Sequence, residues 1–166
     1  MAVTASMVKE LRERTGAGMM ECKKALSETD GDQEAAVELL RKKGAASADK
    51  KSARVAAEGV IVHNISADGK TGVMLEVNCE TDFVAKGDPF NDFVNAVAAR
   101  IASDLPENTA KLMSLPLVDG GESVEEIRKA LVGGKIGENI SIRRFVTLES
   151  SGDEVINGYL HGSKIG

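Results

Sequence analysis

The sequence predicts an α+β fold: an N-terminal module of three helices, a basic linker, and a core of antiparallel sheet with helices packed on one side. Apolar residues recur at helical spacing over the first 45 residues, whereas Val- and Ile-rich segments begin near residue 58. The charge changes too, because residues 1–57 hold 11 basic and 9 acidic side chains and residues 58–166 hold 10 and 17. The predicted parts are therefore the helical module (1–45), the linker (46–57) and the core (58–166).

Three short helices are predicted in the N-terminal module, each between a capping residue and a glycine or polar turn. They are a helix that follows a cap at Thr4 or Ser6 and ends at Gly16, a helix over about Met19–Leu26, and a helix over about Gln33–Lys43 that ends at Gly44. The stretch from Arg41 to Arg54 holds six basic residues against Asp49, and we interpret it as a basic, partly helical linker.

The core is predicted to contain a β-hairpin, two helices and a second pair of strands. The expected segments are strands over Gly59–Ile65 and Val73–Cys79, a helix that starts near Pro89 and buries Phe90 to Ile101, an irregular stretch around Pro106–Gly121, a helix over Val124–Leu131 capped near Ser123, a strand over Ile140–Leu148 and a returning strand over Val155–Leu160. This order favours an antiparallel sheet with helices packed on one side.

The composition limits the compartments in which we expect the protein. No apolar run approaches the roughly 18–20 residues of a membrane-spanning helix, so a transmembrane role is excluded. The first residues lack the apolar region of a secretory signal, and the two cysteines fit a reducing compartment. We therefore expect a cytoplasmic protein with no membrane partner.

The segment from Leu75 to Lys86 holds the densest cluster of reactive side chains. Cys79 as a nucleophile would need a base, and His63 and His161 are both distant in the sequence, which favours a structural cysteine. Glu80 and Asp82 would share one face of a strand, where a solvated surface is the favoured interpretation. The His and Cys spacings match no zinc site. We expect no catalytic residue, no metal and no cofactor.

Two features suggest recognition rather than chemistry. Adjacent Met19 and Met20 cannot both face the core of one short helix, so at least one is expected to be exposed. Phe83 is either a core aromatic or an exposed anchor, and the sequence leaves both open. The Gly134–Gly137 segment matches the Gly-x-x-Gly loop of an RNA-binding module, but a helix stop is favoured; with an acidic chain and five aromatics, direct nucleic-acid binding is not expected.

Three segments resemble the signatures of the bacterial elongation factor Ts family. Leu11 to Leu26 resembles the N-terminal signature of that family, Glu76 to Ala85 resembles its core motif, and Lys135 to Ile140 followed by Arg143-Arg144-Phe145 resembles a third motif. The three occur in the family's order and cover nearly the whole chain. The resemblance implies a ubiquitin-associated-like helical module joined to an α+β core, and the role of a non-enzymatic guanine-nucleotide exchange factor.

The resemblance also implies a partner and the residues that contact it. The partner is elongation factor Tu, in its GDP-bound or nucleotide-free form. Asp82 and Phe83, with Thr81 and Val84 of the same motif, would enter its GTPase domain near the magnesium and phosphate site. Arg12, Met19 and Met20 would dock on a helix of that domain. His161 is expected to lie near the interface.

An alternative hypothesis for the function stays open beside nucleotide exchange. The helical module alone would bind the partner, and the core would be passive, without exchange activity. Longer family members continue past a His-Gly-x-x-Ile-Gly segment into a second core subdomain, whereas this sequence stops at Gly166. A natural short form and a C-terminally truncated form are both open, and so is a homodimer.

Overall fold

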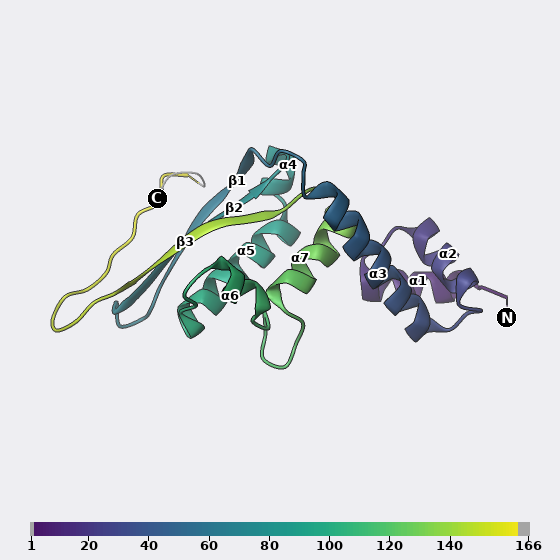
Figure 1. Cartoon of the computed structure of the whole chain (residues 1–166), viewed down its shortest axis with the longest axis horizontal. Helices are drawn as coiled ribbons and strands as arrows, with labels where there is room; N and C mark the ends of the chain where they lie inside the picture. The colour runs from purple at the N-terminus through teal and green to yellow at the C-terminus, as the bar shows by residue number, and fades with distance from the viewer. Residues whose placement is uncertain (1, 163–166) are drawn as a thin grey trace. The chain divides into compact units, whose positions relative to one another are not determined.

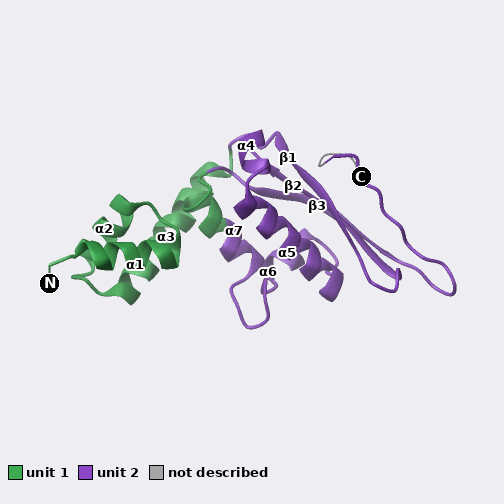
Figure 2. Ribbon diagram, turned by 180° about the vertical axis from the view of Figure 1, so that it is seen from behind, with its two compact units in different colours: residues 1–53, 129–137 green, residues 54–128, 138–166 purple. Residues whose placement is uncertain are grey.

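The computed structural model describes residues 2–162 and divides them into two compact units (Figure 2). Among the described residues, the first unit comprises residues 2–53 and 129–137, and the second comprises residues 54–128 and 138–162. Residues 163–166, which end the His-Gly-x-x-Ile-Gly segment, lie outside the described residues. The predicted division at residues 45 and 57 stays a prediction.

The structure is α+β, as predicted (Figure 1). Helices and one antiparallel three-stranded sheet make up the described chain. In chain order the elements are α1 (Ala5–Thr15), α2 (Met19–Glu28), α3 (Gln33–Lys51), β1 (Glu58–Ile65), β2 (Thr71–Cys79), α4 (Asp82–Ala85), α5 (Asp88–Asp104), α6 (Thr109–Ser114), α7 (Val124–Gly133) and β3 (Ser141–Glu149).

The first unit packs α1, α2 and α3 around a small apolar core. The Thr4 hydroxyl caps α1 by accepting the Met7 N–H at 3.3 Å, and Asp32 caps α3 by accepting the Ala35 N–H at 2.9 Å. Gly16 ends α1 with φ +68°, a conformation that favours glycine. The buried core residues are Val8, Leu11, Ala17, Cys22, Ala25, Leu26 and Ala36. The likeness of this unit to a ubiquitin-associated domain stays a prediction.

The predicted end of the third helix at Gly44 is wrong, because α3 continues to Lys51. Gly44 lies inside the helix, where its backbone closely approaches Gly133 at the end of α7. Two polar contacts hold the added turns: Lys129 pairs with Asp49 at 2.8 Å, and the Lys51 ammonium donates to the Val132 carbonyl at 2.9 Å. Contacts far along the sequence thus extend the helix through a glycine that local rules treat as a terminator.

The sheet has the order β1-β2-β3, with both pairs antiparallel. Its register places Val60 opposite Val77, and Ile142 also opposite Val77 on the other side of β2. In the β1–β2 turn the Ser66 hydroxyl and the Lys70 N–H donate to the Asp68 carboxylate and lower its pKa. The predicted hairpin is therefore confirmed, and β2 lies in the centre of the sheet.

Helix α5 covers one face of the sheet and contacts β1 and β2 (Figure 1). Pro89 lies in its first turn, as predicted. The apolar residues predicted for its inner face are all buried: Phe90, Phe93, Val94, Val97, Ala98 and Ile101. Alternate residues of β2 meet them, namely Val73, Leu75, Val77 and Cys79. The main core of the second unit is this layer between α5 and the sheet.

Two predictions for the chain between α5 and β3 have different outcomes. The stretch predicted to be irregular contains α6, which Asn108 caps by accepting the Lys111 N–H at 2.8 Å and which buries Leu112. Helix α7 is capped by Ser123 as predicted, because the Ser123 hydroxyl accepts the Glu126 N–H while the Glu126 carboxylate accepts the Ser123 N–H.

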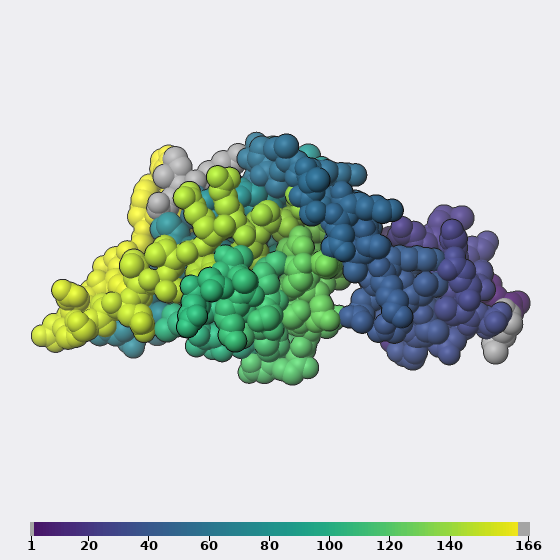
Figure 3. Space-filling model, in the orientation of Figure 1, coloured from purple at the N-terminus to yellow at the C-terminus, as the bar shows by residue number. Residues whose placement is uncertain are grey.

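The strand predicted over residues 155–160 is wrong, since this segment pairs with no strand of the sheet. The Ile156 N–H donates to the Gly69 carbonyl in the β1–β2 turn at 2.7 Å, and the Ile156 side chain lies against Gly72. The segment thus crosses the sheet face opposite α5 instead of extending its edge. Within residues 2–162, the edge of β3 away from β2 pairs with no other strand, and Figure 3 shows side chains of β3 at the surface beside α6.

Among residues 2–162, none of the helices combines the length and apolar character needed to cross a membrane.

Replacing Gly133 with Ala is expected to lower the free energy of unfolding by about 1–3 kcal/mol, because the added Cβ forces the helices apart. That Cβ would overlap the Gly44 carbonyl oxygen. The matched change Gly44→Ala is expected to raise it by about 0.5–1 kcal/mol, as for any helix-interior glycine. Outside its own helix, the nearest atom to a Cβ at Gly44 is the Gly133 Cα, 4.0 Å away. Urea denaturation measures both variants, and equal effects would contradict the one-sided contact.

Candidate partner-binding site

The turn after β2 carries the first set of candidate residues. Strand β2 ends at the buried Cys79, and Glu80 and Thr81 lead into the single-turn helix α4. The Thr81 hydroxyl caps α4 by accepting the Val84 N–H at 3.4 Å, and Ala85 is buried. Because one side of this short helix is anchored in the core, the other side presents Asp82 and Phe83 to solvent.

Phe83 is an exposed aromatic residue. Its side chain is 84% exposed, whereas Phe90, seven positions later, is 1% exposed. The interpretation of Phe83 as a core aromatic is therefore wrong, and the exposed anchor remains. Val84 is half-buried beside it. An exposed phenylalanine on an ordered turn is typical of a residue that becomes buried against a partner.

The two carboxylates of this segment point to different surroundings. Asp82 is exposed at the start of α4 and pairs with Lys86 at 2.7 Å. The Glu80 carboxylate accepts the Asn139 N–H at 2.7 Å and lies 3.5 Å from the Arg54 guanidinium. The two do not share a strand face, because Glu80 follows the last residue of β2 and Asp82 begins a helix. Asp82 is the carboxylate that a partner can reach.

Glu138 contacts this turn from the segment that precedes β3, and the sequence analysis did not identify it. Its carboxylate accepts the N–H groups of Glu80 and Thr81 at 3.1 and 3.0 Å, and the Thr81 hydroxyl at 2.7 Å. The neighbouring Asn139 is buried and donates from its amide to the Arg54 carbonyl at 2.8 Å. Its position in the third motif, Lys135 to Ile140, was the available signal, but nothing local connects it with Thr81.

The second set of candidate residues lies in the first unit, where α1 gives way to α2. Met19 and Met20 open α2 and are 60% and 75% exposed, which confirms that at least one faces solvent. Arg12, in the last turn of α1, is also exposed. The Gly18 N–H donates to the Glu21 carboxylate at 3.2 Å and fixes the start of α2. Exposed methionine side chains are flexible and are typical of adaptable binding surfaces.

The structure separates Cys79 from His63. Cys79 is buried on the α5 side of β2, and its thiol donates to the Thr81 carbonyl at 3.3 Å. His63 pairs with Met74 on the opposite face of the sheet. His161 is exposed, and its ring nitrogen lies 3.1 Å from the Tyr159 hydroxyl. Within residues 2–162, no group of three His, Cys, Asp or Glu side chains is placed to hold a metal ion.

The Gly134–Gly137 segment is a helix stop, as favoured from the sequence. Helix α7 ends at Gly133, and the N–H groups of Ile136 and Gly137 both donate to the Leu131 carbonyl. Gly137 has φ +78°, as expected for a residue that turns the chain out of a helix. The segment thus serves to redirect the chain toward β3.

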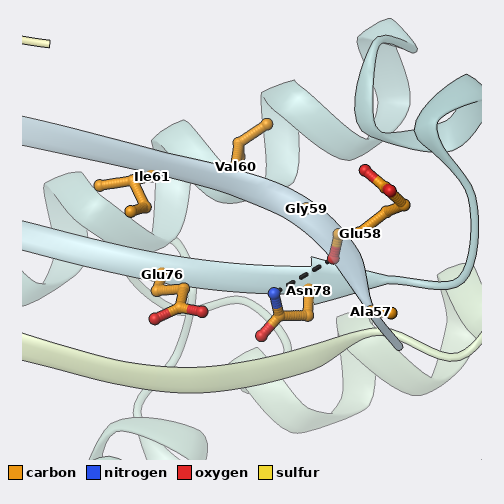
Figure 4. A pocket seen from close by; sticks show the side chains of 7 residues that line it. All are labelled: Ala57, Glu58, Gly59, Val60, Ile61, Glu76 and Asn78. Atoms are coloured by element: carbon orange, nitrogen blue, oxygen red, sulfur yellow. Dashed lines mark hydrogen bonds between the residues drawn. The ribbon is translucent and has the colours of Figure 1, made fainter. Parts of the chain in front are cut away.

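A small hollow lies between the first half of β1 and the second half of β2 (Figure 4). The Asn78 amide donates across it to the Glu58 carbonyl at 3.1 Å. The Glu76 carboxylate, which also lines the hollow, pairs with Arg144 at 2.7 Å and Arg143 at 3.7 Å. The charge of Glu76 is thus compensated by two arginines of β3.

Comparison with known proteins shows the family of this chain. The model of the family described as elongation factor TS matches residues 80–166, which is more than half of the chain. The chain belongs to the elongation factor Ts family. The family match begins at Glu80 and so includes both the Thr81–Phe83 turn and Glu138.

Similar proteins named elongation factor Ts come from several bacteria. The chain is 56% identical over 166 residues to the protein of Thioalkalivibrio sulfidiphilus, 58% to that of Alkalilimnicola ehrlichii and 56% to that of Methylococcus capsulatus. In each case the match covers 100% of this chain and 56% of the relative. The chain therefore spans about half the length of the curated elongation factor Ts relatives that it matches.

Truncation of Phe83 is expected to leave the stability of the chain unchanged. Phe83→Ala should change the free energy of unfolding by less than about 0.5 kcal/mol, because its side chain is already in water. Phe90→Ala, the matched control, should lower it by about 3–5 kcal/mol through the cavity that it leaves. Urea denaturation of the two variants checks this. A loss for Phe83→Ala as large as that for Phe90→Ala would contradict its exposure.

Proposed function

We propose that this chain binds elongation factor Tu and promotes the release of GDP from it during translation elongation. The observation that carries the proposal is the exposed Phe83, set beside Asp82 on an anchored turn, in a chain of the elongation factor Ts family. The chain performs no covalent step in this role. The partner would be met in the cytoplasm, and neither a membrane nor a nucleic acid takes part.

Phe83 would act as an anchor in the GTPase domain of the partner. Burying a phenylalanine side chain contributes roughly 1.5–3 kcal/mol, and aromatic residues dominate the binding energy of many interfaces. A side chain that is 84% exposed before binding retains nearly all of this contribution for the complex. The anchored turn also loses little conformational freedom on binding.

Asp82 would add a negative charge next to that anchor. Near a magnesium ion and phosphate oxygens, a carboxylate attracts the metal and repels the phosphates, and both effects weaken the nucleotide complex. The Asp82 side chain is 63% exposed, and its contact with Lys86 is an exposed ion pair of the kind that contributes little in water. An approaching partner can therefore reach the carboxylate.

Thermodynamic linkage explains how binding of the chain would promote nucleotide exchange. If Phe83 and Asp82 fit only a rearranged magnesium and phosphate site, the chain binds the nucleotide-free partner more tightly than the GDP-bound partner. The chain must then weaken GDP binding by the same factor. Arg12, Met19 and Met20 would dock the first unit on the same GTPase domain and supply affinity independent of the nucleotide.

A specific observation supports the alternative as well. Met19 and Met20 are both exposed, so the first unit offers a docking surface without help from the second. In that case the chain would bind elongation factor Tu while GDP release stays at its uncatalysed rate. Because the chain covers 56% of the length of its relatives, measuring exchange at this length decides between the two.

The chain is expected to accelerate the release of fluorescent GDP from elongation factor Tu in stopped-flow measurements. Phe83→Ala should reduce this acceleration by about tenfold or more, as loss of a buried phenylalanine predicts. Val118→Ala, which truncates another exposed apolar residue, is the control and should match the wild type. Binding without acceleration by the wild type would support the passive-core alternative, and unchanged exchange by Phe83→Ala would remove the anchor.

The docking set is expected to affect affinity rather than the maximal rate. The double variant Met19→Ala, Met20→Ala should raise the concentration of chain needed for half-maximal GDP release by about tenfold. The rate at saturating chain should stay close to that of the wild type, because Phe83 is intact. A titration of exchange rate against chain concentration separates the two quantities. A lower maximal rate with unchanged half-saturation would assign these residues a different role.

A further inference from the structure

The β2–β3 ladder ends just before the candidate site. The last pair is Asn78 opposite Ser141, and beyond it the two segments separate. One leads through Glu80 and Thr81 into α4, and the other arrives from α7 through Gly137. The N–H groups of residues 80 and 81 therefore have no ladder partner across the sheet, and such groups need another acceptor.

Two glutamates replace the missing ladder bonds in a reciprocal arrangement. The Glu138 carboxylate accepts the N–H groups of Glu80 and Thr81 at 3.1 and 3.0 Å. In return, the Glu80 carboxylate accepts the Asn139 N–H at 2.7 Å and is compensated by Arg54 at 3.5 Å. Hydrogen bonds to ionised acceptors are stronger than those between neutral groups. Each segment is thus held by a side chain of the other.

Thr81 connects this arrangement with the residues that project from the turn. Its hydroxyl donates to the second Glu138 oxygen at 2.7 Å and accepts the Val84 N–H at 3.4 Å. Asp82 and Phe83 lie between these two points of attachment. The direction in which they leave the surface therefore follows from how Thr81 is held.

Helix α4 needs such support because it has only four residues. A single helical turn is not stable by itself, since nucleation of a helix is unfavourable. The exposed Asp82–Lys86 pair contributes little. On one side of the turn Ala85 is buried and its carbonyl accepts the Asn91 amide at 3.0 Å. On the other side the Thr81 carbonyl accepts the Cys79 thiol at 3.3 Å, and the Glu138 carboxylate accepts the Thr81 hydroxyl and N–H.

We propose that Glu138 is a positioning residue that holds the Thr81–Phe83 turn in the orientation with which Asp82 and Phe83 engage elongation factor Tu. This inference rests on the proposed exchange function. Glu138 acts on the partner through Thr81. Without it the turn samples other orientations, and the fraction ready to engage the nucleotide site falls.

The test compares three variants in the GDP-release assay. Glu138→Ala should lower the maximal rate at saturating chain by about tenfold or more, because the turn loses its preorganisation. Its half-saturating concentration should change much less, since Met19 and Met20 still dock. Glu138→Gln should restore most of the rate, because the amide oxygen can accept both N–H groups and the NH₂ can donate to the Thr81 hydroxyl. Glu107→Ala, an exposed glutamate, is the control.

A second measurement examines the hydrogen bonds in the chain alone. Amide hydrogen exchange followed by NMR should show protected Glu80 and Thr81 amides in the wild type and in Glu138→Gln. In Glu138→Ala these two amides should lose protection, while the Val77 amide in the β2 ladder keeps it. This contrast separates a local loss from global unfolding of the variant.

The outcomes distinguish the inference from the proposed function. Wild type that fails to accelerate GDP release overturns the proposed function, and the amide measurement still decides whether Glu138 holds the turn. Equal amide exchange in wild type and Glu138→Ala overturns the inference. So does an unchanged maximal rate in Glu138→Ala, and so does a Glu138→Gln variant as slow as Glu138→Ala with its amides still protected.

Discussion

Burial of one face of β2 against α5 is the contact on which the candidate site depends. Leu75, Val77 and Cys79 are fully buried on that face, and the strand must end where this burial ends. The chain then turns through Glu80 and Thr81 so that α5 can return across the same face of the sheet. The turn that carries Asp82 and Phe83 is thus a consequence of the packing of the core.

Phe83 in this turn and Phe90 in α5 show how stability and recognition are divided. Phe90 is buried between α5 and the sheet and contributes to folding, whereas Phe83 remains in water. Leaving a large aromatic side chain exposed forgoes a contribution to folding, which is then available to binding. In the first unit the methionines at the start of α2 are likewise exposed, whereas Cys22, Ala25 and Leu26 of the same helix are buried in the core.

Local patterns predicted most elements but failed where a distant segment intervenes. The inner face of α5 was predicted because apolar periodicity reflects one buried side of a helix. The end of α3 was not, because Gly44 meets the backbone of Gly133, 89 positions away, and the helix continues. The segment over 155–160 has apolar residues suited to a strand. Lys70, however, holds the Gly152 and Glu154 carbonyls, and the chain then crosses the face of the hairpin.

By itself the sequence determined the α+β class, the family motifs and the segment in which the candidate site lies, because periodicity, capping residues and short motifs are local properties of the chain. Whether Phe83 is buried or exposed was decided only by the tertiary structure, since both choices are compatible with a phenylalanine at the end of a strand. The role of Glu138 was decided there as well. Its partners lie 57 and 58 positions away, and only the meeting of the ends of β2 and β3 brings their N–H groups to its carboxylate.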